Sequence, residues 1–103
     1  MMITSNQISG KTITETYGLV QGSSIRARHA GHDIMAGLKS IVGGEINEYT
    51  KLMAESREQA IDRMKDEAKR LGANAITDVR FTTSVLMGGA AELLAYGTAV
   101  RIN

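Results

Sequence analysis

The residues best suited to metal chemistry are the chain's two histidines. His29 and His32 lie three positions apart, and Asp33 follows directly. Imidazole and carboxylate groups at this spacing on a helix could bind zinc, nickel or copper. A stable protein site needs three or four ligands, and the pattern specifies no further one. The alternative is a solvated loop that leads into the first turn of a helix.

The same stretch is locally basic, which suggests a second kind of site. It follows Gly22-Ser23-Ser24, a sequence typical of a turn, and its basic residues are Arg26, Arg28, His29, His32 and Lys39. A turn and a helix N-terminus with this charge could hold phosphate or another anion. Neither G-x-G-x-x-G nor the P-loop pattern occurs. A solvated basic surface is the alternative.

Charged residues also interrupt the apolar side of a long helix expected from about Glu45 to Leu71. By helical phase, Arg57 and Glu67 fall within that side, and Arg63 lies at its border. Such charges must reach solvent, pair, or contact a partner. We expect Arg57 to tie the helix to a neighbouring element or subunit. Ile61, on the flank of the apolar side, is a candidate interface residue together with Glu67.

Catalytic patterns are weak. The sequence contains neither a serine nucleophile elbow nor H-E-x-x-H. Glu92 is an isolated acid between Ala91 and Leu93, and a solvated or aggregation-limiting role is the simplest interpretation. In a ring of subunits, repeated copies of Glu92 could hold cations. We expect no enzyme activity, no catalytic residue and no assigned cofactor, although a divalent metal remains an open alternative.

Composition narrows the class of protein. The chain has 103 residues, formal net charge +1, no cysteine, no proline and 4% aromatic residues. This length fits one domain, residues 1–103. The charge balance gives no reason to expect nucleic acid or a membrane as partner. The absence of cysteine, and a start without a signal-peptide pattern, predict a cytoplasmic protein.

Glycines separate the elements that would position these residues. Apolar residues between Ile34 and Val42 have helical spacing and predict a short helix, which Gly43-Gly44 ends. The long helix follows, and Gly72 is its expected C-cap. At ~1.5 Å per residue this helix would be about 40 Å long, more than the roughly 33 Å diameter of a compact domain of this size. A helix longer than its domain argues for assembly.

Three strands complete the pattern. We expect them over Thr12–Gln21, Ala75–Thr83 and Leu93–Ile102, with a short edge strand at Met1–Thr4. Ala75, Thr77, Val79 and Phe81 should share one face of the second strand, and Leu94, Tyr96, Thr98, Val100 and Ile102 one face of the third. The long helix is a crossover that favours parallel first and second strands. The third strand, antiparallel to the second, could lie between them.

The motifs, in this order along the chain, resemble the YbjQ-like family, whose members are labelled heavy-metal-binding. The resemblance extends from Thr12 to Val100 and rests on Gly18-Leu19-Val20-Gln21-Gly22, Ile41-Val42-Gly43-Gly44, Tyr49, Arg57 with Ala60, Leu71-Gly72-Ala73-Asn74-Ala75 and Gly97-Thr98-Ala99-Val100. Some members carry a cysteine where this chain has Tyr17, a difference that bears on any thiol-dependent metal role.

The resemblance implies an α+β subunit of β-α-β-β order, similar to dodecin subunits, with an antiparallel sheet in the order 1-3-2. It also implies ring-like homo-oligomers, with pentamers expected, and no established enzyme activity. We therefore expect a non-enzymatic homo-oligomeric module that binds a metal ion or a small ligand. The alternative is a structural or protein-interaction ring without a small ligand.

Overall fold

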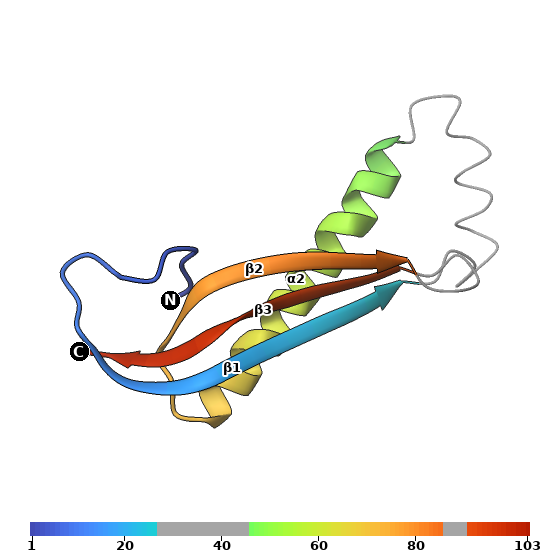
Figure 1. Cartoon of the computed structure of the whole chain (residues 1–103). Helices are drawn as coiled ribbons and strands as arrows, with labels where there is room; N and C mark the ends of the chain where they lie inside the picture. The colour runs from blue at the N-terminus through green and yellow to red at the C-terminus, as the bar shows by residue number, and fades with distance from the viewer. Residues whose placement is uncertain (27–45, 86–90) are drawn as a thin grey trace.

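The described residues form a three-stranded sheet with one long helix on one face. The computed structural model describes residues 1–26, 46–85 and 91–103, with the helix side chains described from residue 51 onward. The elements are β1 (Ile13–Arg26), α2 (Ile46–Arg70), β2 (Ala75–Val85) and β3 (Ala91–Ile102). Figure 1 shows the sheet in front of α2, and the predicted short helix at Ile34–Val42 lies outside the described residues.

The sheet has the predicted order. β3 lies between β1 and β2 and pairs antiparallel with both. β1 and β2 therefore run parallel to each other, as the crossover predicted. The small α+β architecture and the strand order are confirmed.

The turn predicted at Gly22-Ser23-Ser24 is wrong, because β1 continues without a turn to Arg26. Gly22 serves a different purpose, since it lies under the helix. A Cβ atom at this position would overlap the carbonyl oxygen of Ala60 and the backbone nitrogen of Met64. The glycine therefore lets β1 and α2 approach more closely than any larger residue would allow.

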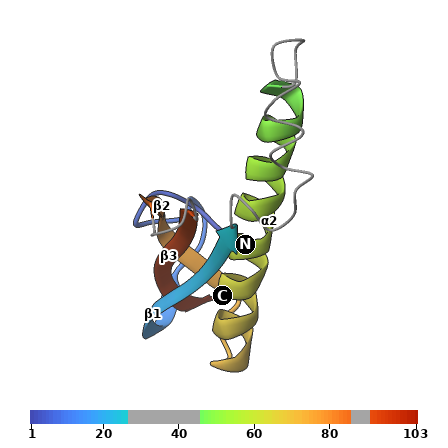
Figure 2. The ribbon, with the colours of Figure 1, turned by 90° about the vertical axis from the view of Figure 1, so that its right-hand side faces the viewer.

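The helix packs its small and apolar residues against β1 and β3. Ala60, Met64 and Ala68 are buried in the main core together with Val20, Ala95 and Ala99. As predicted, Gly72 ends the helix with a positive φ of 93°. The N–H groups of Gly72 and Ala73 donate to the carbonyls of Lys69 and Ala68, both at 3.1 Å, which is the Schellman arrangement. The N-terminal half of α2 extends beyond the sheet (Figure 2).

A β-bulge divides β2 into two halves with different faces. The register shifts between Thr77 and Arg80, and Asp78 has a positive φ of 54°. Ala75 packs with Val100 on the sheet face away from the helix, whereas Val79 belongs to the core under the helix. The predicted single face through Ala75 and Val79 is therefore wrong, because the extra residue reverses the alternation of side chains.

The N-terminal segment covers one end of the sheet. Backbone hydrogen bonds join Met1 and Ile3 to Ile76, and Ile3 and Ser5 to Val79 and Asp78. Ile8 packs with Val100 and Ile102 in a second, smaller core. Where the sequence predicted an edge strand at Met1–Thr4, the structure has one parallel bridge, between Met2 and Ile76. This segment closes the first half of the β2 edge.

We predict that Gly22→Ala destabilises the fold strongly, because the new methyl group meets helix backbone rather than a movable side chain. The free energy of unfolding should fall by about 2 kcal/mol or more, as measured by urea denaturation. Ser23→Ala is the matched control, because the Ser23 side chain lies on the face of β1 that points away from the helix. Equal stability of the two variants would show that the close approach is not a constraint.

Candidate functional site

The predicted metal ligands lie outside the described residues. His29, His32 and Asp33 all belong to the stretch 27–45, for which the structure gives no description. Within residues 1–26, 46–85 and 91–103, no group of three or more histidine, cysteine, aspartate or glutamate side chains comes together to hold a metal ion. The metal interpretation therefore stays a prediction.

Arg57 does not occupy the buried side of the helix. The buried row consists of Ser56, Ala60, Met64 and Ala68, at a regular spacing of four residues. Arg57 is exposed and Ile61 is half-buried, so both lie on the flank of this row. The expectation that Arg57 falls within the apolar side is wrong for the single subunit. The fully buried row is narrower than the predicted apolar side, although the half-buried Met53 also packs against the core.

Glu67 and Arg63 instead bind the free edge of β1. The Arg63 guanidinium donates to the carbonyl of Ser23 at 2.6 Å. The backbone N–H of Gln21 donates to a carboxylate oxygen of Glu67 at 3.3 Å. These two helix residues satisfy backbone groups that an edge strand otherwise leaves open to another chain.

One turn earlier on the helix, Gln59 extends the same pattern. Its side-chain oxygen accepts from Ser24 Oγ at 2.8 Å and from the Arg26 guanidinium at 3.1 Å. Ser56 donates to Ser24 at 3.0 Å, and both serines are buried. Gln59, Arg63 and Glu67, spaced four residues apart, thus contact the last part of β1, from Gln21 to Arg26. We call these three residues the β1-edge row.

The helix end is fastened to the same strand. The Tyr17 hydroxyl lies 3.4 Å from the carbonyl oxygen of Gly72, which also accepts from Arg101 at 2.8 Å. A hydrogen bond to the Glu15 carboxylate raises the pKa of Tyr17, and partial burial adds to this, while Arg101 acts in the opposite direction. The phenol therefore remains neutral at physiological pH. At the position where some family members carry cysteine, this chain thus has a structural contact.

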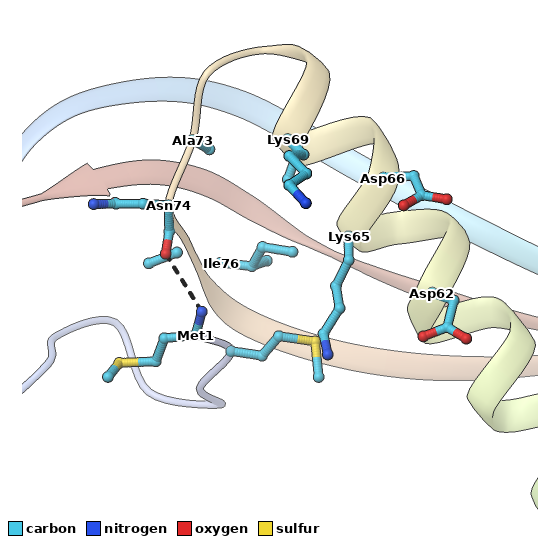
Figure 3. A pocket seen from close by; sticks show the side chains of 11 residues that line it. Met1, Asp62, Lys65, Asp66, Lys69, Ala73, Asn74 and Ile76 are labelled. Atoms are coloured by element: carbon cyan, nitrogen blue, oxygen red, sulfur yellow. Dashed lines mark hydrogen bonds between the residues drawn. The ribbon is translucent and has the colours of Figure 1, made fainter.

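On the opposite flank of the helix, an open hollow lies between α2, the start of β2 and the N-terminal segment. It has a volume of about 610 Å³, and the lining includes Lys65, Lys69, Met2 and Ile76. In Figure 3 the Lys65 and Lys69 side chains extend into this space, and Asp62, Asp66 and the N-terminal Met1 are also part of its lining. No pattern in the sequence indicated this hollow, because its residues come together only when residues 1–2 pair alongside the start of β2.

The polar side chains beside β1 already have hydrogen-bond partners. Glu92 is half-buried within β3, where it pairs with Ile25 and Ser84 across the sheet. In the described part of the chain, the polar side chains of the β1-edge row are occupied with backbone and side-chain hydrogen bonds. These contacts organise the fold and leave the hollow as the candidate binding space.

Comparisons with known proteins agree with the fold and motifs. A family model described as "Putative heavy-metal-binding", with the name YbjQ_1, matches residues 1–103. The chain belongs to this family. A UPF0145 protein from Methanosarcina acetivorans is 55% identical over 102 residues, covering 99% of this chain and 96% of the relative. A UPF0145 protein from Archaeoglobus fulgidus is 54% identical over 103 residues, covering 100% and 95%.

A solved structure supports the architecture alone. The crystal structure of a protein of unknown function from Pediococcus pentosaceus matches with a TM-score of 0.59 at 19% identity, covering 100% of this chain and 97% of that one. At this identity the likeness extends to the fold and not to an activity. In the described part of this family member, no helix has the length and apolar character needed to cross a bilayer.

We predict that Arg63→Met weakens the fold, because it removes the donor to Ser23 and keeps the length of the side chain. The free energy of unfolding should fall by about 1 kcal/mol, as measured by thermal or urea denaturation. Arg70→Met is the control, at an exposed position on the same helix. Indistinguishable unfolding of the two variants would show that the β1-edge row does not stabilise the strand.

Proposed function

We propose that this protein is a non-enzymatic, homo-oligomeric binding module. The supporting observation is the outer half of β2, beyond the bulge. Phe81 and Val85 are 43% and 86% exposed, on the side of the sheet that α2 covers elsewhere. An apolar strand end on the helix side of a sheet is normally covered by a second layer. Within the described residues, no element covers it.

A second copy of the chain is the occupant that best fits this surface. The helix extends beyond the sheet and presents Ile61 and Arg57 on a flank that its own strands leave uncovered. A net charge of +1 does not oppose self-association. Among the described residues, the edge of β2 after Arg80 also has no strand partner, whereas β1 from Gln21 to Arg26 is contacted by the β1-edge row. We propose a closed ring, with five subunits as the family resemblance implies.

The assembly is tested by native mass spectrometry of the purified protein. The double variant Phe81→Ser/Val85→Ser should shift the mass distribution toward smaller species, because it removes apolar area from the contact. Ile13→Ser is the matched control, since Ile13 is 37% exposed at the other end of the sheet. A monomeric wild-type protein at micromolar concentration would contradict the assembly itself. If the double variant has the same mass distribution as the wild type, the surface at Phe81 and Val85 is not the contact between subunits.

Arg57→Ala provides an independent test of the helix flank. Arg57 is exposed in the single subunit, so its removal should leave the folding of that subunit nearly unchanged. If Arg57 contacts a neighbouring subunit, the variant should dissociate at a higher protein concentration than the wild type. Analytical ultracentrifugation over a dilution series measures this directly. Equal dissociation and melting temperature in the variant and the wild type would remove Arg57 from the interface.

A metal ion is one ligand that such a module could bind, and the family description supports it. The candidate ligands remain His29, His32 and Asp33. Isothermal titration with Zn²⁺ and Ni²⁺ should show binding that His29→Ala/His32→Ala abolishes. If the wild type shows no binding of either ion below high-micromolar concentrations, the metal-binding hypothesis is wrong. A metal-free oligomer with a co-purifying protein would favour the alternative function, a structural or protein-interaction ring.

A further inference from the structure

We propose that the hollow beside the end of α2 binds a small amphiphilic anion, with a carboxylate or similar group on the two lysines and a short apolar chain on the opposite wall. The proposal names a ligand class for the binding module, and it rests on that proposed function. The residues come from one chain, namely from α2, from the segment 73–76 and from the N-terminus. Binding therefore does not depend on assembly.

Most of the positive charge in the hollow comes from one helix row. Lys65 and Lys69 are four residues apart, so their side chains leave the same face of α2. Both extend into the hollow in Figure 3, and the lining also includes the N-terminal ammonium of Met1 and the carboxylates of Asp62 and Asp66. The three ammonium groups outnumber the two carboxylates, so the charge of the lining favours a single anionic group. The acidic residues beside them explain why the sequence shows no basic patch here.

The C-terminal end of α2 repels an anion less strongly than a helix end whose last carbonyl groups have no hydrogen-bond donors. The last carbonyls of a helix carry partial negative charge. Here the carbonyls of Ala68 and Lys69 accept hydrogen bonds from Ala73 and Gly72. Their lone pairs are therefore directed toward the chain reversal. The ammonium groups of Lys65, Lys69 and Met1 supply the positive charge that faces the hollow.

Part of the lining is apolar and offers contact to a short hydrocarbon chain. Met2 and Ala73 are half-buried there, whereas Ala68 and Ile76 are almost fully buried beneath them, and Asn74 adds a polar side chain. Methionine adapts its shape to irregular apolar ligands. The volume of about 610 Å³ is within the range of small-molecule sites. An inorganic anion would leave this apolar surface unused, and a hydrocarbon would leave the lysines unpaired.

Hexanoate is the probe, and amide chemical shifts of the full-length protein are the measurement. We expect saturable shift changes confined to the residues that line the hollow, namely residues 1–2, 62–69 and 73–76. Lys65→Gln and Lys69→Gln should each raise the dissociation constant for hexanoate by about fivefold. Lys51→Gln is the matched control, an exposed lysine on the same helix and outside the hollow. It should bind hexanoate within about twofold of the wild type.

Two further ligands separate the contributions of charge and hydrocarbon. Acetate and hexan-1-ol should each bind more weakly than hexanoate, because each lacks half of the interaction. Binding of either with the affinity of hexanoate, shift changes elsewhere, or no saturable binding below about 10 mM would overturn the proposal. Native mass measured on the same samples reports assembly separately. An intact oligomer that ignores hexanoate would therefore refute the ligand class and leave the assembly standing.

Discussion

The contact between α2 and β1 at Gly22 is the constraint on which the rest of the structure depends. The missing side chain at this position brings the helix backbone directly onto the strand. Only then can Ala60 and Met64 close the core over Val20, and only then can helix side chains reach past β1 to its edge. A larger residue would separate the two elements and break both sets of contacts.

This close approach makes the two edges of the sheet different. Along β1, Gln59, Arg63 and Glu67 bind strand backbone and side-chain groups, so the edge offers little to another chain. Along β2, the N-terminal segment covers only the part before the bulge. Charged groups on an edge are a common means of preventing unwanted strand pairing. In the described residues, helix side chains thus contact β1 from Gln21 to Arg26, whereas the end of β2 has no such contacts.

The two flanks of the helix have different roles: one makes the structural contacts with β1, and the other carries the residues of the proposed binding site. The flank beside β1 is occupied by hydrogen bonds that hold the fold. The other flank carries Lys65 and Lys69 into an open hollow and, further along, presents Ile61 and Arg57. Family members share this sequence at about half of their positions over nearly the whole chain. Ligand binding and self-association can use this flank without altering the core.

The sequence by itself determined the long helix, its glycine end and the relative directions of the strands, because these follow from local periodicity and from the geometry of a crossover. The strand order 1-3-2 was implied by the family resemblance. It indicated that Glu67 and Arg63 are unusual, but not what they bind, since the edge of β1 meets the helix only after folding. It misplaced Arg57 because helical phase gives a direction and not the width of the buried row. The bulge at Asp78, the role of Gly22 and the hollow beside Lys65 were decided by tertiary structure. Each depends on contacts between segments distant in the chain, and local pattern carries no information about such distances.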